Sequence, residues 1–338
     1  MSDTSTAMTA AAFAMDAHLP MALFDAESQG RLRARLDMCS SHPINDFASA
    51  DPAMLAELEV LITGWGAPRI GALELELMPK LRAIFHAAGT VKGHLLPEVW
   101  DRGIRVTTSA AVNAWPVAEY TIGMILLAGK GVLPHLPHEE TAESLTAHPG
   151  NAPVGNYRRT VGIIGASTVG RLVIRLLSEF DFDVLLYDPI ISKDDPILAL
   201  AHQVGLDELF ARSSIVSAHV PLLPSTIGMV GERELALLAP GSTFINTARA
   251  PIVDQRALIA AVRNRGIRAI LDVTDPEPLP ESHVLRTLPG VMLTPHVAGA
   301  LGNEVRRLGE SVVREVELFS RGFEAAYPVN KQDLAAMA

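Results

Sequence analysis

One segment, Val161 to Gly170, constrains the fold of this chain more than any other. It reads Val-Gly-Ile-Ile-Gly-Ala-Ser-Thr-Val-Gly, an apolar strand that runs into a glycine turn and then a helix. Asp188 ends the next apolar stretch, roughly 20 residues after the turn, which is the spacing of a dinucleotide-binding βαβ unit. In such a unit Gly165 permits the tight turn, Gly170 lets the helix pack on the strand, and the helix N-terminus faces a pyrophosphate.

The segment departs from the G-x-G-x-x-G pattern at Ser167, where a glycine usually lets the backbone approach phosphate. An ordinary strand–turn–helix junction therefore remains an alternative on this segment alone. The dinucleotide interpretation predicts that Asp188 accepts the ribose hydroxyls of NAD and repels the extra phosphate of NADP. It also predicts cofactor contacts from the turn and the helix start, namely Gly165, Ser167, Thr168, Val169 and Gly170.

Size and charge narrow the class of protein. The chain has 338 residues, enough for two domains, and 49% of them are hydrophobic, enough for a sizeable core. A net charge of −10 argues against nucleic acid or an anionic membrane as a partner, but says little about a small anion in a local pocket. We predict no metal site.

Three further features bear on location. The one cysteine, Cys39, leaves no intrachain disulfide, which suits a cytoplasmic location. The N-terminus lacks the basic leader of a signal peptide. The longest apolar run, Tyr120–Leu127, is expected to be a buried helix, too short to span a bilayer.

Short apolar strands alternate with helical stretches along the chain, which predicts parallel βαβ units. Strands are expected at 13–15, 60–63, 81–85, 104–107, 161–164, 183–187, 215–219, 242–246, 269–272 and 291–294. Helices are expected at 53–59, 73–79, from 113 through 127, and at 170–179, 206–211, 232–238, 254–263 and 303–321. Residues 133–158 are predicted to be a surface excursion. The pattern predicts an α/β fold with two Rossmann-like parallel-sheet domains. The dinucleotide-binding domain, residues 113–299, is inserted in the middle, and residues 1–112 and 300–338 form the other domain.

Three polar residues follow predicted strands of the second series, at the sheet edge where ligands gather in α/β proteins. They are Arg249, Glu277 and His296. Histidine suits proton transfer near neutral pH, a glutamate beside it favours the imidazolium, and arginine binds a carboxylate through two hydrogen bonds. Such a set serves hydride transfer to a carbonyl next to a carboxylate.

Each of the three also has an ordinary structural interpretation. His296 could cap a loop, Glu277 between two prolines could be a solvated turn residue, and Arg249 could pair with Asp254. Taken singly, these interpretations are the better ones. Taken together at the strand ends of a dinucleotide fold, the three residues favour a catalytic set.

The chain resembles the D-isomer-specific 2-hydroxyacid dehydrogenase family in blocks from about residue 80 to Asn330, with their order preserved. The blocks are Asn113-x-x-x-Val-Ala-Glu119, Gly162–Gly170, Val216–Pro221, Phe244–Arg249 with Val253 and Asp254, Leu271-Asp-Val-x-x-Pro-Glu-Pro278, and Thr294-Pro-His296.

The resemblance implies an NAD-dependent oxidoreductase that acts on small 2-hydroxy or 2-keto acids. It implies that His296 is the acid/base, Glu277 its partner and Arg249 the substrate clamp. It adds His219, Pro221, Thr247, Ala248 and Asp272 to the cofactor contacts, with Asp272 at the nicotinamide carboxamide. It implies that the turn at Ala88, Gly89 and Thr90 receives the substrate carboxylate, so residues 1–112 and 300–338 would be the substrate-binding domain. A homodimer with the helix after Asn113 in its interface is typical.

Some positions depart from the family pattern. Ser167 replaces a glycine, Thr168 stands where many members have arginine, and Ala250 replaces the glycine after the catalytic arginine. Lys92 lies near a position often held by an acid or asparagine, which leaves the substrate open. Two other functions stay open. One is a formate dehydrogenase-like enzyme, disfavoured because those enzymes place glutamine where Glu277 stands. The other is a dehydrogenase-like NAD-sensing regulatory protein, which turnover of NADH with 2-keto acids would distinguish.

Overall fold

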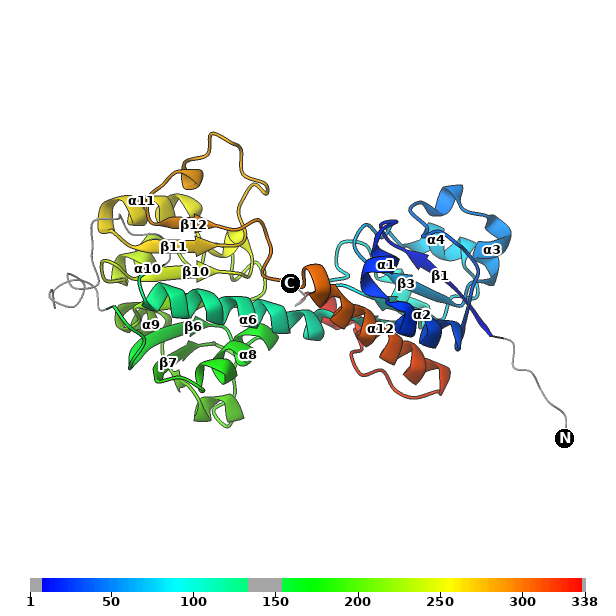
Figure 1. Ribbon diagram of the computed structural model, residues 1–338, viewed down its shortest axis with the longest axis horizontal. Coiled ribbons are helices and arrows are strands. Elements are labelled where there is room, and N and C mark those ends of the chain that lie inside the picture. Colours follow the sequence, from blue (N-terminus) through cyan, green and yellow to red (C-terminus); the bar gives the residue numbers. More distant parts are fainter. Residues whose placement is uncertain (1–7, 133–153, 336–338) are drawn as a thin grey trace. The chain divides into compact units, whose positions relative to one another are not determined.

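A computed structural model describes residues 8–132 and 154–335 (Figure 1). The chain divides into two compact units, Met1–Asn113 with Ala300–Met337, and Ala114–Gly299. Each unit contains one parallel sheet, of five strands in the first and seven in the second. The predicted fold class, two parallel-sheet α/β domains with one inserted in the middle of the chain, is confirmed. Most of the predicted surface excursion at 133–158 lies outside the described residues.

The sheet of the first unit has the strand order β2-β1-β3-β4-β5. Its strands are β1 (Thr9–Ala14), β2 (Leu36–Met38), β3 (Val60–Thr63), β4 (Ala83–His86) and β5 (Arg105–Thr108). The helices of this unit are α1 (Leu19–Leu23), α2 (Ala26–Arg33), α3 (Pro52–Glu57), α4 (Ala72–Leu77), α5 (Glu98–Asp101) and α12 (Val305–Ser320).

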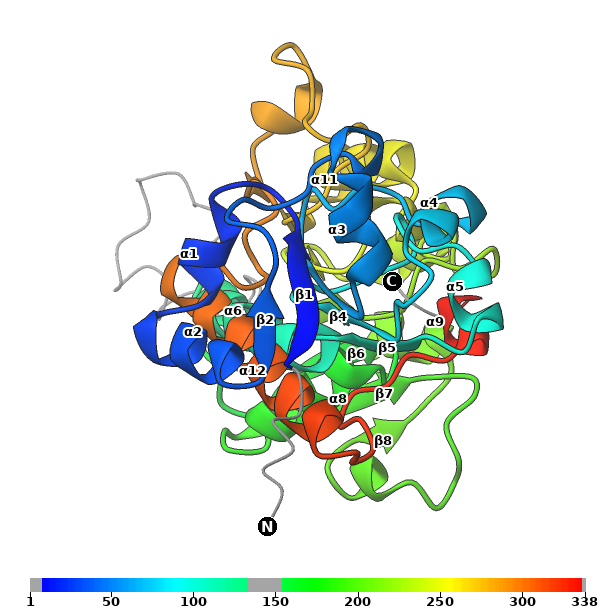
Figure 2. The ribbon, with the colours of Figure 1, turned by 90° about the vertical axis from the view of Figure 1, so that its right-hand side faces the viewer.

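Alternate residues of these strands enter two separate cores, because successive side chains of a strand point to opposite faces. Val60 and Ile62 pack with α1, α2 and α12, whereas Leu61 packs with α3, α4 and α5. Figure 2 shows α1, α2 and α12 on one side of β1, with α3 and α4 on the other. The strands β3 and β4 are buried on both faces, as in most parallel sheets.

The sheet of the second unit has the strand order β12-β11-β10-β9-β6-β7-β8. Its strands are β6 (Arg159–Ile164), β7 (Phe182–Tyr187), β8 (His202–Gln203), β9 (Ile215–Ala218), β10 (Thr243–Asn246), β11 (Arg268–Leu271) and β12 (Val291–Leu293). The helices are α6 (Ala110–Gly129), which begins in the first unit, α8 (Thr168–Leu177), α9 (Leu206–Arg212), α10 (Glu232–Leu237) and α11 (Gln255–Arg265).

The order of these strands reverses at β6, which has β7 on one side and β9 on the other. Helices α6 and α8 cover one face of the sheet, and α9, α10 and α11 cover the other (Figure 1). Ligands of doubly wound sheets bind at the carboxyl ends of the strands where the order reverses. The glycine turn after β6 lies at that point of this sheet.

Helix α6 is longer than the apolar run on which it was predicted. By length and composition alone the whole helix could cross a membrane, whereas the apolar run Tyr120–Leu127 within it is too short to do so. A single such helix is weak evidence, because the core helix of a folded domain meets the same criteria. One face of α6, with Ala118, Ile122 and Ile125, packs in a core of the second unit.

The predicted element bounds differ from the observed ones mainly at the ends. Strand β1 lies at 9–14 rather than 13–15, β4 ends at His86 rather than Phe85, and α6 begins at Ala110 rather than Asn113. Strands β2 and β8 and helices α1, α2 and α5 were not predicted. Strand β8 has two exposed residues, and α2 has only two buried ones. Neither element therefore has the hydrophobic periodicity by which it could be predicted from the sequence.

The contact between α12 and α1 provides a test of packing in the first unit. A Cβ on Gly309 would lie 2.0 Å from the carbonyl oxygen of Leu23, which belongs to the backbone and cannot swing away. We expect Gly309→Ala to destabilise the unit by about 1–3 kcal/mol, the usual effect of overpacking. Gly30→Ala in α2, where no atom lies within 4 Å, is the control and should be neutral or stabilising. Equal unfolding midpoints in urea for the two variants would contradict this.

Candidate active site

The turn after β6 requires both of its flanking glycines. Gly165 has a φ of +95°, and a Cβ there would lie 2.6 Å from Cγ1 of Val220. A Cβ on Gly170 would lie 2.0 Å from the carbonyl oxygen of Gly165. The first glycine therefore serves the turn and the second lets α8 pack against it, as expected for a dinucleotide-binding turn.

Ser167, the departure from the glycine pattern, fits the same turn without strain. Its backbone is extended, with φ −63° and ψ 177°, and its side-chain oxygen accepts a hydrogen bond from the N–H of Gly170 at 3.3 Å. Ser167 is thus the N-cap of α8, and Thr168 and Val169 begin the helix. The first N–H groups of a helix have no partner within it, so this end can bind an anion. The turn therefore fits the pyrophosphate of a dinucleotide.

Asp188 follows β7 and is tied to the turn. Its Oδ2 accepts a hydrogen bond from the N–H of Ala166 at 2.7 Å, and its Oδ1 accepts one from the N–H of Ile190 at 2.9 Å. The acidic position is thereby fixed beside the glycine turn, where an adenosine ribose binds in this fold.

An ion pair that the sequence did not indicate supports the same turn. Arg171 donates from Nε to the carbonyl oxygen of Ala166 at 2.8 Å, and from both terminal nitrogens to Asp195, at 2.7 and 2.6 Å. These hydrogen bonds lower the pKa of Asp195 to about 2. The negative charge of Asp188 also helps to raise the pKa of Arg171. The guanidinium of Arg171 is nevertheless paired with Asp195 and not with Asp188.

His219, expected among the cofactor contacts, turns its ring into the core. Its Nε2 lies 2.9 Å from the hydroxyl oxygen of Ser217, and only 3% of the residue is exposed. Burial lowers the pKa of His219 to about 3, so the ring is neutral. The backbone of His219 faces the glycine turn, because a Cβ on Gly165 would lie 3.2 Å from its carbonyl group. Pro221 is partly exposed and follows on the same segment.

The residues after β10 form a closed turn that presents Arg249. Asn246 donates from Nδ2 to the carbonyl oxygen of Arg249 at 2.9 Å and accepts from the N–H of Ala248 at 3.0 Å. Thr247 is buried, with its hydroxyl 3.2 Å from that of Thr121 on α6. Asn246 is a positioning residue that the sequence analysis missed.

Arg249 is partly buried, and its Nη1 donates to the carbonyl oxygen of Ala248 at 2.7 Å. Burial lowers the pKa of Arg249, and the charge of Glu277 opposes that shift. The alternative pairing with Asp254 does not form, because Asp254 caps α11 by accepting the N–H groups of Arg256 and Ala257. Within the described residues Arg249 forms no ion pair.

His296 and Glu277, which lie 19 positions apart along the chain, are in direct contact. The Nδ1 of His296 lies 2.7 Å from Oε1 of Glu277, and both side chains are nearly half exposed. This leaves Nε2 as the ring nitrogen free to meet a substrate. His296 has a φ of +55°, a left-handed conformation that costs a non-glycine residue roughly 1–2 kcal/mol. The surrounding loop must therefore hold this residue in place.

Asp272, at the end of β11, holds that loop. Its Oδ1 accepts the hydroxyl of Thr294 at 2.6 Å and the N–H of Val297 at 2.9 Å, and its Oδ2 accepts the N–H of Ala298 at 2.9 Å. Its backbone carbonyl accepts the N–H of His296 at 3.0 Å. Asp272 is 2% exposed, so a buried carboxylate anchors the segment that carries the histidine.

The turn at 88–90 belongs to the first unit and is described with that unit alone. Two of its carbonyl oxygens accept hydrogen bonds. The hydroxyl of Thr108 donates to the carbonyl oxygen of Ala88 at 2.9 Å and also to that of Gly89. Within the described part of the chain, no hydrogen bond uses the N–H groups of Ala88, Gly89 or Thr90. The family resemblance predicts that these N–H groups receive a substrate carboxylate, as adjacent backbone donors in a turn can, and this stays a prediction.

Two histidines, the buried His86 and the partly buried His94, lie beside this turn. His86 ends β4, its Nδ1 lies 2.9 Å from the hydroxyl oxygen of Thr63, and it forms a hydrogen bond with the backbone of Thr90. Its ring lies 4.6 Å from that of His94. Burial, with the nearby His94, holds the pKa of His86 well below its usual range, and burial lowers the pKa of His94 to about 4.

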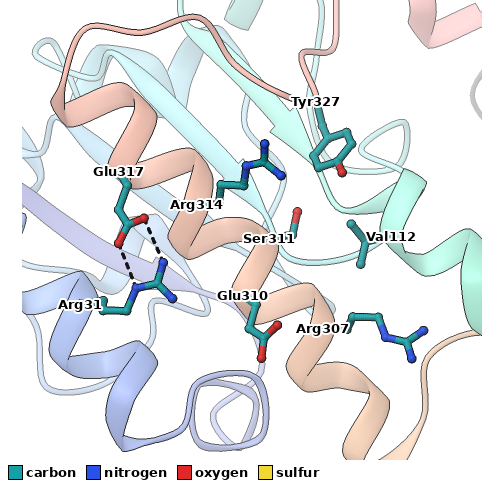
Figure 3. A pocket seen from close by; sticks show the side chains of 8 residues that line it. All are labelled: Arg31, Val112, Arg307, Glu310, Ser311, Arg314, Glu317 and Tyr327. Atoms are coloured by element: carbon teal, nitrogen blue, oxygen red, sulfur yellow. Dashed lines mark hydrogen bonds and ion pairs between the residues drawn. The ribbon is translucent and has the colours of Figure 1, made fainter.

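A separate groove of about 490 Å³ lies in the first unit beside α12 (Figure 3). Its lining carries charges of both signs: Arg31 forms two hydrogen bonds of 2.9 Å with Glu317, and Arg307 and Arg314 line the groove with Glu310. None of the predicted site residues lines this groove. The candidate active site is therefore formed by the strand ends described above, not by this groove.

Comparison with known proteins agrees with that geometry. The family model described as D-isomer specific 2-hydroxyacid dehydrogenase, NAD binding domain, matches residues 136–298. A glyoxylate reductase of Thermofilum pendens is 31% identical over 276 residues, which cover 79% of this chain and 80% of that protein. This chain belongs to the D-isomer specific 2-hydroxyacid dehydrogenase family.

Other relatives of this 2-hydroxyacid dehydrogenase differ in length and in the substrate that they are named for. A D-3-phosphoglycerate dehydrogenase of Mycobacterium leprae is 29% identical over 280 residues, and the match covers 80% of this chain but 51% of that protein. The crystal structure of a phosphoglycerate oxidoreductase from Rhizobium etli has a TM-score of 0.77 and 26% identity, and covers 95% of this chain and 98% of that one.

Membership of the family makes this protein an oxidoreductase that acts on CH–OH donors, with NAD as its cofactor. The predicted family, enzyme class and cofactor are confirmed. The site residues and the roles of the two domains stay predictions, as do the homodimer, the cytoplasmic location and the absence of nucleic-acid and membrane partners.

The buried His219 predicts a pH dependence of stability in the cofactor-free protein. Its pKa in the folded state, about 3, lies below the value near 6.5 of an unfolded histidine. The stability that it contributes is therefore complete above pH 6.5 and is lost as the pH falls toward 3, at about 1.4 kcal/mol per pH unit. We measure the free energy of unfolding with urea between pH 7.5 and 5. Below pH 6.5 it should fall less steeply with decreasing pH in His219→Gln than in the wild type, by about this amount. The same pH dependence of the unfolding free energy in the wild type and in His219→Gln would rule this account out.

Proposed function

We propose that this dehydrogenase interconverts a small D-2-hydroxy acid and its 2-keto acid, with NAD. The observation that carries the proposal is the contact of 2.7 Å between His296 and Glu277, beside an arginine without an ion-pair partner in the described structure. The three residues supply a proton donor, a group that orients it, and a cation for a carboxylate. Glyoxylate, hydroxypyruvate and phosphoglycerate-like acids are the proposed substrates, supported by the names of the relatives.

In the proposed mechanism each residue acts through an identified atom. His296 delivers a proton from Nε2 to the carbonyl oxygen during reduction and removes it during oxidation. Glu277 accepts the Nδ1–H hydrogen bond, which orients the ring and stabilises the imidazolium. Arg249 binds the substrate carboxylate and polarises the adjacent carbonyl. NAD, when bound, accepts or supplies the hydride.

The proposed cofactor contacts follow the sheet edge of the second unit. The turn Gly165–Gly170 would hold the pyrophosphate and Asp188 the adenosine ribose. His219 would contribute only through its backbone, because its ring is bonded to Ser217 in the core. Asp272 receives one hydrogen bond on Oδ2, so this oxygen keeps a lone pair for the nicotinamide carboxamide.

The turn at 88–90 is proposed to bind the substrate carboxylate through its free N–H groups. Thr108 and His86 fix the carbonyls of this turn, which leaves the N–H groups directed elsewhere. Lys92, whose N–H donates to the hydroxyl of Thr90 at 3.2 Å, closes the turn. Backbone N–H groups of a turn are donors, so the turn suits an anion.

The catalytic assignment is tested by replacing His296. We expect His296→Ala to lower kcat for NADH-dependent reduction of glyoxylate or hydroxypyruvate by a factor on the order of a hundred or more, because proton transfer is lost. Steady-state assays with a panel of 2-keto acids measure this. His202→Ala, an exposed histidine of β8 in the same unit, is the matched control and should keep wild-type rates.

Two further variants separate the other roles. Glu277→Gln should make the reduction rate decline at a lower pH than in the wild type, because an uncharged partner no longer favours the imidazolium. Arg249→Ala should raise KM for the keto acid and lower kcat while the NADH affinity stays nearly unchanged. Near-normal turnover by His296→Ala with a good substrate would overturn the assignment, and an NAD-sensing regulatory protein would then be the better account.

The choice of cofactor depends on Asp188. A carboxylate accepts ribose hydroxyls but repels a phosphate, and the nearby Arg171 is paired with Asp195. We expect kcat/KM with NADH to exceed that with NADPH by roughly tenfold or more, an effect of about 1.4 kcal/mol. Asp188→Ser should lower this ratio of kcat/KM with NADH to kcat/KM with NADPH. Asp183→Ser in β7 is the control and should leave the ratio unchanged. Equal efficiencies with both cofactors in the wild type would refute this prediction.

A further inference from the structure

Helix α6 contributes a hydroxyl to the strand-end network that holds His296. The phenol oxygen of Tyr120 lies 2.7 Å from the hydroxyl oxygen of Thr294, which in turn lies 2.6 Å from Oδ1 of Asp272. Tyr120 and Thr294 lie 174 positions apart in the sequence, and no motif links them. All three residues belong to the second unit.

The direction of these hydrogen bonds follows from a count of protons. The hydroxyl of Thr294 has one proton, and it goes to the carboxylate of Asp272, which accepts but does not donate. Tyr120 must therefore donate to Thr294. Burial raises the pKa of Tyr120, which keeps the phenol protonated for this role. The chain of donors runs from Tyr120 to Thr294 to Asp272.

The end of this chain is the loop that carries the proposed acid/base. Asp272 accepts the N–H groups of Val297 and Ala298 on its carboxylate, and that of His296 on its backbone carbonyl. His296 is in a left-handed conformation, which persists only when its surroundings impose it. If Tyr120 no longer donated to Thr294, the Thr294 hydroxyl could turn away from the Asp272 carboxylate. Both groups could then form other hydrogen bonds.

We propose that Tyr120 and Thr294 form a latch that acts through Asp272 to hold His296 in position against Glu277. Tyr120 is thus a positioning residue for the reaction, contributed by α6, a helix that begins in the first unit. The latch rests on the function proposed above, because it matters for catalysis only if His296 is the acid/base.

The test uses hydroxyl deletions in the full-length protein. Tyr120→Phe should lower kcat for keto-acid reduction by roughly three- to tenfold, the kinetic equivalent of one hydrogen bond, with KM for NADH unchanged. Thr294→Val should lower kcat at least as much. Thr294→Ser keeps the hydroxyl and should therefore have the wild-type kcat. The double variant Tyr120→Phe/Thr294→Val should be no slower than Thr294→Val alone, because both changes break the same chain.

Amide hydrogen exchange followed by mass spectrometry provides a readout that does not need activity. Tyr120→Phe and Thr294→Val should speed exchange in the peptide that covers residues 294–299, whereas Thr294→Ser should not. Tyr157→Phe is the matched control, since this tyrosine is 76% exposed, and it should change neither exchange nor kcat.

Three results would overturn the latch: unchanged exchange in Tyr120→Phe, faster exchange with unchanged kcat, or additive losses of kcat in the double variant. Failure of the proposed function is distinguishable from these, because the wild type would then reduce none of the keto acids. The exchange rates alone would then decide whether Tyr120 holds the loop.

Discussion

The loop that carries His296 depends on one buried carboxylate. Where a strand of a parallel sheet ends, its ladder of backbone hydrogen bonds ends too, and the N–H groups of the loop that follows need other acceptors. Asp272 supplies them, with three donors on its two carboxylate oxygens and a fourth on its backbone carbonyl. Because these donors come from residues 294–298, the end of β11 fixes the loop after β12, and with it the left-handed backbone of His296.

The fold could be predicted largely from apolar runs, because parallel strands are buried on both faces. Val60–Thr63 and Ile215–Ala218 are fully buried and were placed within a residue of their observed bounds. Elements without such a run were missed. Strand β8 has two exposed residues, and α6 extended a turn beyond the segment expected for it because Ala110 and Ala111 continue the helix without a polar signal.

The site divides in the same way. Residue types at strand ends indicated Arg249, Glu277 and His296, and the structure brings the last two within 2.7 Å. Their supporting residues could not be predicted, since Tyr120, Asn246 and Arg171 act through contacts that no local pattern encodes. Ser167 shows the converse case. As a departure from the glycine motif it left an ordinary strand–turn–helix junction open, but its extended backbone needs no glycine and its hydroxyl caps the helix.

The proposed function requires a strongly acidic protein to hold an anionic substrate, and the local charge is consistent with that. The net charge of −10 is spread over the whole chain, whereas Arg249 is partly buried, its pKa lowered by burial, and without an ion-pair partner in the described structure. A cation that has lost water and gained no carboxylate is stabilised by any anion that reaches it, through charged hydrogen bonds of about 1.5–3 kcal/mol each. Glu277 is near enough to oppose the pKa shift of Arg249, but its carboxylate is bound to His296 instead. The arginine is thus kept available by the same contact that orients the histidine. In the proposed mechanism, substrate binding and proton transfer therefore depend on one geometry, and an error in the His296 loop would disturb both.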